Sequence, residues 1–432
     1  MSSKAAGKQD AKPALTPKLR FPEFRDAPEW KAVSLEQASV PVVERVGERK
    51  LTPVSISAGI GFVPQAEKFG RDISGKQYQL YTLVRDGDFV FNKGNSLKFP
   101  QGCVYLLQGW GEVAAPNVFI CFRLRKGYSN GFFQNCFEKN THGIQLKRHI
   151  TSGARSNGLL NIGKETFFGV QIPTPLPAEQ QKIAECLTTL DEVIAAQARK
   201  LAALKTHKQG LMQQLFPREG ETQPRLRFPE FQGNWALTSG ADITSKITKG
   251  SSPSWQGFSY QKDGVLFITS ENVRDGFLDV SVPKFLPEEF FAKQKNSQLL
   301  YGDILINIVG ASIGRNCVFR LHQEAFTNQA VALFRVTKGH SFEFVSYCYQ
   351  HDRSQKAVSA SQSDSARPNL SLTDLRNMEF IMPTLPEQQR IATCLTSLDD
   401  LITAQSAKLE ALKTHKKGLM QQLFPSPETN EG

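Results

Sequence analysis

The stretch EQQKIAECLTTLDEVIAAQARKLAALKTHKQGLMQQLFP, residues 179–217, decides the fold because the chain contains it twice. The second copy, residues 387–425, is EQQRIATCLTSLDDLITAQSAKLEALKTHKKGLMQQLFP, and 29 of the 39 aligned positions are identical. Such long, matched, periodic segments predict two copies of one long helix. The chain is therefore an internal duplication.

A second pair of matching blocks precedes the helices. PKLRFPEFRDAPEW begins at Pro17 and PRLRFPEFQGNW begins at Pro224. We call these blocks the arms. Each arm is followed by a long segment, the first insert at 31–173 and the second insert at 236–382, and these two inserts barely resemble each other. A conserved frame thus holds two different inserts, and this asymmetry points towards function.

Both helices carry a coiled-coil seam, because apolar residues recur every three or four positions. The predicted pairing residues of the first helix are Ile183, Leu187, Leu190, Ile194, Gln197, Leu201, Leu204, Leu211 and Leu215. Those of the second helix are Ile391, Leu395, Leu398, Ile402, Gln405, Leu409, Leu412, Leu419 and Leu423. Matched polar residues, Gln197 with Gln405 and Lys208 with Lys416, interrupt the seam, and such interruptions cost stability but determine register and partner.

The short linker predicts the direction of the helices. The seven steps from Pro217 to Pro224 reach at most ~25 Å, whereas each helix is ~55 Å long. The second half must therefore begin near the far end of the first helix. We expect an antiparallel intramolecular coiled coil in a pseudo-twofold arrangement, with one insert at each end. The alternative is that the helices pair between two chains.

Length and composition suit a two-domain chain with connecting elements. The chain has 432 residues, of which 40% are hydrophobic, and no apolar run approaches the ~20 residues that cross a bilayer. Residues 1–16 are polar and lack the apolar core of a signal peptide, so we expect a disordered tail on a cytoplasmic protein. The seven cysteines form no CxxC pair, which indicates neither a disulfide framework nor a zinc site.

The positive charge is concentrated in one half of the chain. The whole chain carries +11, and the first insert accounts for +8, from 18 basic and 10 acidic residues. The second insert carries only +1, from 15 basic and 14 acidic residues. A basic excess indicates a polyanionic partner, most often nucleic acid, although charge can also serve solubility.

The inserts consist of short aromatic and β-branched runs separated by Gly, Asn and Pro, which predicts mostly strands. The predicted fold class is α+β, with two mostly-β or mixed domains and two long helices. The expected boundaries are 1–16 tail, 17–173 first domain, 174–217 first helix, 218–235 linker and arm, 236–382 second domain, 383–425 second helix and 426–432 tail.

Catalytic motifs are missing from the sequence. Gly70 to Lys76 has the GxxxxGK spacing of a phosphate loop, but Gln77 stands where Ser or Thr is required and no hydrophobic strand precedes it. The sequence contains no HExxH, no His/Cys ligand cluster and no GxSxG. We therefore predict no metal and no cofactor of its own.

The order arm, insert, helix, repeated once, resembles the DNA specificity subunits of Type I restriction–modification systems. The resemblance rests on PLPAEQQKIA and TLPEQQRIA at the helix starts, GLMQQLFP at their ends and LRFPEF…W in the arms. It implies that each insert is a target recognition domain that reads one half of a bipartite, asymmetric site on double-stranded DNA. It also implies that the helices set the spacer and dock two methyltransferase subunits, that endonuclease/translocase subunits join them, and that AdoMet, ATP and Mg belong to those partners.

Basic and amide side chains in Gly-rich turns are the candidate base contacts, since Arg and Lys suit guanine and Asn and Gln suit adenine. The candidates in the first insert are Arg71, Lys76, Asn92, Lys93, Asn95 and Lys98. Those in the second insert are Lys249, Ser251, Ser252, Trp255, Arg274, Asn307, Arg315 and Asn316. The alternative for each one is a solvated turn residue.

Two other classes of protein compete with this interpretation. One is a fused restriction or modification enzyme whose catalytic motif has diverged beyond recognition. The other is a coiled-coil adaptor that binds protein only. Methyl transfer without added subunits would favour the enzyme, and failure to enrich a bipartite DNA motif would favour the adaptor.

Overall fold

The computed structural model describes residues 15–94, 99–150, 160–292, 294–360 and 369–425. Within them the chain forms two compact units, one of residues up to Gln197 together with those from Lys408 onwards, and one of Ala198–Ala407. The two long helices are α6 (Pro177–Leu215) and α12 (Leu385–Leu423), of 39 residues each. Each unit therefore contains one insert, one arm and part of both helices, whereas the sequence-based boundaries treated each helix as a separate segment.

The first unit is built on two small sheets and a pair of strands that joins its ends. The antiparallel sheet has the order β2 (Ser39–Pro41), β9 (Ile120–Leu124), β6 (Asp88–Asn92), β7 (Cys103–Leu106). The mixed sheet has the order β4 (Gly61–Pro64), β3 (Thr52–Ser57), β8 (Glu112–Ala115), β5 (Thr82–Arg85). The joining pair is β1 (Lys31–Ser34) with β10 (Gln171–Thr174). Its short helices are α1 (Leu35–Ala38), α2 (Gln65–Phe69), α3 (Asn130–Glu138), α4 (Thr141–Leu146), α5 (Lys164–Phe168) and the 3-10 turns η1 (Pro22–Phe24), η2 (Gly75–Leu80) and η3 (Lys147–His149).

The second unit has the same plan. Its antiparallel sheet has the order β12 (Thr244–Lys249), β18 (Val331–Val336), β15 (Ile304–Asn307), β16 (Asn316–Val318). The second sheet is β14 (Phe285–Leu286), β13 (Val265–Ile268), β17 (Ala325–Thr327), and the joining pair is β11 (Ala236–Ser239) with β19 (Glu379–Met382). Its short helices are α7 (Gly240–Ile243), α8 (Glu288–Ala292), α9 (Phe342–Gln350), α10 (Asp352–Ala360), α11 (Leu372–Asn377) and the turns η4 (Ser254–Gln256), η5 (Lys295–Ser297) and η6 (Gly310–Ser312).

The two inserts therefore share one topology despite their dissimilar sequences. Strands β2, β9, β6 and β7 correspond to β12, β18, β15 and β16, and the parallel pair β3 and β8 corresponds to β13 and β17. An ion pair between a buried aspartate and a partly exposed arginine marks the same point in both. Asp88 accepts from Arg123 at 2.6 Å, and Asp303 accepts from Arg335 at 2.7 Å. These matched residues serve the shared fold.

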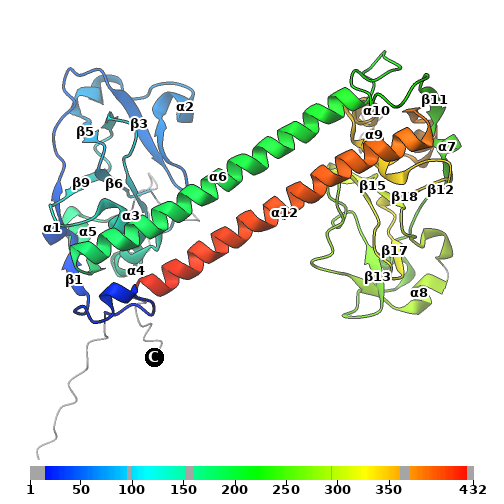
Figure 1. Ribbon diagram of the computed structural model, residues 1–432. Helices are drawn as coiled ribbons and strands as arrows, with labels where there is room; N and C mark the ends of the chain where they lie inside the picture. The colour runs from blue at the N-terminus through cyan, green and yellow to red at the C-terminus, as the bar shows by residue number, and fades with distance from the viewer. Residues whose placement is uncertain (1–14, 95–98, 151–159, 293, 361–368, 426–432) are drawn as a thin grey trace, which may run out of the picture. The chain divides into compact units, whose positions relative to one another are not determined.

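The core of each unit joins its antiparallel sheet to the long helices through one short helix. In the first unit α3 packs between the sheet and the start of α6 (Figure 1). Gly131 allows this approach, since an added Cβ would lie 3.0 Å from the Cβ of Ala184. In the second unit α9 has the same role, and Phe344 packs against Phe216 at 5.3 Å between ring centroids. The long helices are therefore part of each domain core.

One carboxylate at the start of each long helix holds the arm. Glu179 is 1% exposed and accepts from Arg20 at 2.7 and 2.8 Å and from the Trp30 indole at 3.3 Å. Glu387 repeats this network with Arg227 at 2.7 and 2.8 Å and Trp235 at 3.3 Å. Charge-assisted, bidentate bonds of this kind are strong and directional. They explain why Arg and Trp recur in both arms.

The next helix residue, a glutamine, holds the short helix of the insert. The side-chain oxygen of Gln180 accepts from the backbone amide of Ser129 at 2.9 Å, and Ser129 is the residue that caps α3. Gln388 accepts from the Ser341 amide at 3.0 Å, where Ser341 caps α9. The repeated motif EQQ is therefore the joint between frame and insert.

Within each unit the start of one long helix lies beside the end of the other, so the helices are antiparallel there. In the first unit Ile183 and Leu187 share a core with Leu423. In the second unit Ile391 packs with Leu215 in the same way. In the described chain the predicted pairing residues of both helices are all buried or half-buried. The combination of long helices and small sheets is the predicted α+β fold.

The lysines that interrupt the seam have defined partners on the opposite helix. Lys208 donates to Asp399 at 2.7 Å, and Lys416 binds Asp191 at 2.7 Å and Glu138 at 3.1 Å. Because each lysine meets the aspartate at the matched position, the ion pairs select this register. In the second unit the lysine, Lys208, lies on α6, and in the first unit the lysine, Lys416, lies on α12. An antiparallel duplication requires this exchange.

None of the described helices combines the length and the apolarity needed to cross a membrane.

Candidate nucleic-acid interface

In the second unit, four strand ends far apart in sequence meet at one edge. The Gly250 amide donates to the Asn328 carbonyl at 3.1 Å, and the Asn328 amide donates to the Ile268 carbonyl at 3.1 Å. The Asn307 side chain donates to the Ser270 carbonyl at 3.0 Å. These bonds bring the segments that follow β12, β13, β15 and β17 together. We call this set of segments the second recognition edge.

The loop that follows β12 is the most prominent part of this edge. Lys249 ends the strand and is exposed, and Trp255 is 89% exposed in η4. The Ser251 hydroxyl donates to the Gln294 side chain at 2.9 Å, and the Ser252 hydroxyl lies 3.0 Å from that of Ser254. These serines therefore shape the loop, and Lys249 and Trp255 are its exposed candidate residues.

Two arginines lie on the neighbouring segments of the same edge. The Gly276 amide donates to the Asn316 carbonyl at 2.9 Å, which joins the segment after β13 to the start of β16. Arg274 lies 3.4 Å from Asp279, and Arg315 lies 3.8 Å from Asp275. Their side chains are 43% and 41% exposed, so both guanidinium groups reach solvent at the edge.

Two of the sequence-based candidates in the second unit are buried. Asn307 is 0% exposed and donates to backbone oxygens as well as to the Ser312 hydroxyl at 3.1 Å. Asn316 is 1% exposed and donates to the Ser346 hydroxyl at 2.9 Å. Because these amides hold the strand ends in place, their side chains do not lie on the surface. We therefore do not retain them as base contacts.

The first unit has an equivalent edge. Asn92 occupies the position of Asn307 at the end of β6, and its side chain donates to the Ile56 carbonyl at 3.0 Å and accepts from the Gly94 amide at 2.7 Å. The same Ile56 carbonyl accepts from Lys68 of α2 at 3.4 Å. Helix α2 and the end of β6 are therefore neighbours. Asn92 is half-buried and holds the turn, so it is a weaker candidate than its exposed neighbours.

Three of the remaining candidates of the first unit lie in the part of the chain that the structure describes. Arg71 follows α2 directly, Lys76 lies in η2, and both are exposed. The backbone carbonyl of Lys93 accepts from the Leu160 amide at 2.9 Å. Lys93 itself is half-buried. Asn95 and Lys98 lie outside the described residues. The structure therefore retains Arg71 and Lys76 as the exposed basic candidates of the first unit.

Sequence reasoning missed the exposed apolar side chains on these loops. Ile60, in the turn between β3 and β4, is 75% exposed, and Val43, after β2, is 65% exposed. Phe277, after β13, is 60% exposed. For Ile60 the signal was its position between two glycines, Gly59-Ile60-Gly61, because turns run over the protein surface.

Not all of the positive charge of the first insert is available to a ligand. Arg85 donates to Glu44 at 2.6 Å and to Glu112 at 2.9 Å, and Arg123 is paired with Asp88. The guanidinium groups of Arg85 and Arg49 lower the pKa of the Glu44 carboxyl to about 2. These arginines are engaged in ion pairs within the domain, so the other basic residues remain the candidates for DNA contacts.

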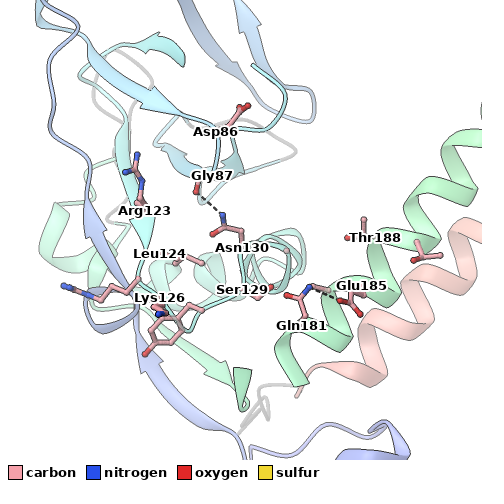
Figure 2. A pocket seen from close by; sticks show the side chains of 15 residues that line it. Asp86, Gly87, Arg123, Leu124, Lys126, Ser129, Asn130, Gln181, Glu185 and Thr188 are labelled. Carbon is pink, nitrogen blue, oxygen red and sulfur yellow. Dashed lines mark hydrogen bonds between the residues drawn. The ribbon is translucent and has the colours of Figure 1, made fainter. Parts of the chain in front are cut away.

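A cleft of about 820 Å³ lies in the first unit between the segment after β9 and the start of α6. Figure 2 shows Asp86 and Arg123 on one side of it and Gln181, Glu185 and Thr188 on the helix. Asp86 already accepts from the amides of Trp110 and Gly111 at 3.0 Å each, and these bonds lower its pKa. A carboxylate so engaged stabilises a turn and is poorly suited to general acid–base chemistry.

Helix α9 of the second unit differs at the equivalent position. Phe342 replaces Asn130, and its ring would lie 3.0 Å from a Cβ added to Gly302. Asn130 and Gly131 of α3, both small, line the cleft in the first unit. Among the described residues, no cluster of three or more His, Cys, Asp or Glu side chains could hold a metal ion.

The family model described as the Type I restriction modification DNA specificity domain matches residues 82–206 and 245–414. Together these matches cover more than half of the chain, and each spans part of one insert and of the helix that follows it. The protein belongs to this family.

Individual relatives agree with the family match. The chain is 25% identical over 293 residues to the Type I restriction enzyme MjaVIII specificity subunit of Methanocaldococcus jannaschii, covering 66% of this chain and 68% of that protein. It is 25% identical over 266 residues to the Type I restriction enzyme EcoBI specificity subunit of Escherichia coli, covering 56% of this chain and 54% of that protein. The crystal structure of the Type I restriction–modification S subunit from M. genitalium has the same fold, with a TM-score of 0.60, 13% identity and coverage of 96% of this chain and 100% of that one.

Proposed function

We propose that this protein is a non-catalytic subunit that gives a Type I restriction–modification complex its DNA sequence specificity. Each insert reads one half of a bipartite, asymmetric site on double-stranded DNA. The long helices set the spacer between the half-sites and dock two methyltransferase subunits, which endonuclease/translocase subunits join.

The observation that carries this proposal is that two units of one topology present different edges. The first unit offers exposed Arg71 and Lys76, whereas the second recognition edge offers Lys249, Trp255 and an arginine pair. Two units of one topology thus display different chemistry. That combination suits two readers of unlike base sequences, because base-edge contacts specify a sequence and the scaffold positions them.

The docking role rests on residues of the helices that are identical in both copies yet exposed. Packing inside the described chain does not require such residues to match. An external partner that binds both copies through the same surface requires these residues to match. The exposed identical pairs are Gln181/Gln389, Ala196/Ala404, Lys200/Lys408, Ala203/Ala411, Lys205/Lys413, Thr206/Thr414, His207/His415, Gln213/Gln421 and Gln214/Gln422.

The spacer role rests on the continuity of the helices. Each runs for 39 residues, about 58 Å, and contributes to both units. Side-chain ion pairs at Lys208 and Lys416 hold the register of the pair. A helical pair held in one register transmits a fixed separation better than a flexible linker does.

The methyl transfer and the DNA cleavage belong to the partner subunits in this proposal. AdoMet, ATP and Mg would bind there, and this chain would supply only binding and orientation. The sequence carries no amino-methyltransferase NPP[FY] motif, which supports this division. Methyl transfer by the purified chain without added subunits would overturn it.

The decisive experiment co-expresses the chain with a methyltransferase subunit from its host and sequences the methylated positions in the DNA of the expression strain. We expect one bipartite, asymmetric motif with a fixed spacer. Methylation without a motif, or a motif that survives deletion of either insert, would refute the proposal. Gel shifts with random-sequence duplexes test the competing protein-only adaptor, which would enrich no motif.

A second experiment tests the spacer role separately. Seven residues, one heptad, are inserted into the middle of both helices, so that the seam stays continuous and each helix lengthens by about 10 Å. The motif should keep both half-sites and gain about three base pairs of spacer, at 3.4 Å per base pair. Altered half-sites with an unaltered spacer would contradict the division of labour between inserts and helices. The matched control is the same heptad inserted into one helix only, which breaks the register.

A further inference from the structure

Trp255 is the most exposed large hydrophobic side chain among the described residues, at 89%. A tryptophan can bury ~150–250 Å² of surface, so leaving it in water forgoes a large stabilisation. The tryptophans of the two arms, Trp30 and Trp235, are by contrast buried, at 3% and 4% exposure. Trp255 therefore contributes little to the stability of its own domain, which indicates a role in contact with another molecule.

The loop presents this side chain in a defined position. The Gln256 and Phe258 amides donate to the Pro253 carbonyl at 2.9 and 3.1 Å. Gly257 ends the turn at φ 79°, a left-handed conformation that favours glycine. At the base of the loop, any side chain in place of Gly250 would collide with the Thr327 carbonyl. Trp255 is thus held at the tip of a compact turn that is anchored to the sheet.

The charge of the second insert restricts how it can bind DNA. Its net charge is +1, against +8 for the first insert. The edge arginines face acidic partners, Arg274 with Asp279 and Arg315 with Asp275. Phosphate contacts therefore supply less binding free energy to this domain than to the first, and a contribution that does not depend on charge is needed.

We propose that Trp255 inserts its indole ring into the second half-site and stacks on an unstacked base. This inference rests on the proposed function and deepens it by naming the mode of reading. A planar ring on a narrow, rigid tip has the geometry of the apolar wedges that open a base step. When the indole stacks on the base, it replaces the contact that the base loses with its neighbour in the duplex, and it buries the exposed ring. This binding free energy does not depend on positive charge in the protein.

This mode of binding has a consequence for the DNA sequence. Opening a step costs least at pyrimidine–purine steps, which are the most easily unstacked. The second half-site therefore contains a TA or CA/TG step where Trp255 inserts, although no side chain hydrogen bonds need define that step. The first half-site, which is bound by the more basic insert, carries no such requirement.

The test uses the full chain assembled with its methyltransferase subunit and a duplex that carries the motif found in methylated host DNA. Wild type, Trp255→Ala and Trp255→Phe are compared, with 2-aminopurine placed at the pyrimidine–purine step. We expect Trp255→Ala to weaken binding about 5- to 150-fold, which corresponds to the loss of one base stack, while Trp255→Phe retains most of the affinity. The 2-aminopurine emission should change on binding of wild type and not on binding of Trp255→Ala.

The salt dependence separates stacking from charge. Trp255→Ala should weaken binding by the same factor at every salt concentration, whereas Lys249→Ala should reduce the slope of log affinity against log salt by about 1. Trp110→Ala, which removes a 38%-exposed tryptophan of the first unit, is the matched control and should leave the emission change intact. Thermal unfolding of Trp255→Ala should match wild type, because so exposed a side chain has few contacts to lose.

Three outcomes would overturn the inference. Unchanged affinity and emission in Trp255→Ala, with a wild-type complex that still selects its motif, would refute insertion and leave the proposed function standing. Loss of methyltransferase binding by Trp255→Ala, with unchanged DNA binding of the chain alone, would assign Trp255 to a protein interface. A wild-type complex that selects no motif would refute the proposed function and this inference with it.

Discussion

The joint between arm and helix gives the sharpest test of how the frame is held together. Glu179→Ala removes the carboxylate that binds Arg20 and Trp30. The Arg20 side chain is only 8% exposed, so its charge would remain largely desolvated without its carboxylate partner. Breaking a buried ion pair in this way costs about 3–5 kcal/mol. For a unit of about 200 residues, that corresponds to a fall in Tm of about 6–20 °C.

The duplication supplies an internal comparison. Glu387→Ala breaks the equivalent network in the second unit, but Arg227 is 22% exposed and its charge can be partly resolvated. We therefore expect a smaller loss than for Glu179→Ala. Glu185→Ala, on the same helix and exposed, is the control and should change stability by no more than about 0.5 kcal/mol.

Calorimetric unfolding of the full chain measures these effects, and hydrogen exchange in the arm assigns them to the joint. A double-mutant cycle with Arg20→Ala should give a coupling free energy of about 1–3 kcal/mol, since the two residues are in direct contact. If Glu179→Ala behaves like Glu185→Ala, or if the cycle shows no coupling, the joint does not hold the arm and the reasoning from its burial is refuted.

Three further predictions concern acid stability, helix register and DNA binding. Burial lowers the pKa of His142 to about 4 in the folded protein, whereas the imidazole in the unfolded chain is protonated below about pH 6.5. Because the unfolded chain then binds the proton more tightly, the free energy of unfolding should fall by about 2 kcal/mol between pH 7 and pH 5. His142→Phe should remove this loss in pH-dependent denaturant melts; an unchanged pH profile would contradict it. Lys208→Glu should destabilise the second unit by about 1–2 kcal/mol through repulsion of Asp399, and adding Asp399→Lys should restore stability in thermal melts; no recovery in the double variant would count against this register. Arg71→Ala and Lys76→Ala should each relax the first half-site at one position by about 1–3 kcal/mol, and a uniform loss of affinity for all DNA sequences with a salt slope lower by about 1 would assign them to phosphates instead.

The candidate site was only partly predictable, and the asparagines show why. The sequence predicts base contacts for Asn92 and Asn307, because amides in Gly-rich turns suit adenine. Both instead donate to a backbone carbonyl, that of Ile56 in β3 in one unit and that of Ser270, just after β13, in the other. A side chain that satisfies a backbone oxygen at a strand end has the same local sequence context as one that faces DNA. Only the packing of the second sheet distinguishes the two.

Trp255 illustrates the opposite case. Its loop, TKGSSPSWQG, signals a turn, and an aromatic residue in such a turn could equally have folded back onto the domain. The close approach of Gly250 to Thr327 and the bonds to Pro253 hold the loop outward. The sequence identified the residue, and its exposure depends on contacts with a strand more than seventy positions away along the chain.

The amino-acid sequence by itself determined the frame: two arms, two long helices, their antiparallel direction and the polar residues that interrupt their seam. These features depend on local periodicity and on the reach of a short linker, and both can be worked out from residue order alone. The tertiary structure decided which side chains form the recognition edges, and it revealed one topology beneath two unlike inserts. The recognition edges and the shared topology arise from backbone pairing between strands that are distant in sequence. Hydrogen-bond geometry selects which strands pair, and side-chain identity constrains that choice only weakly.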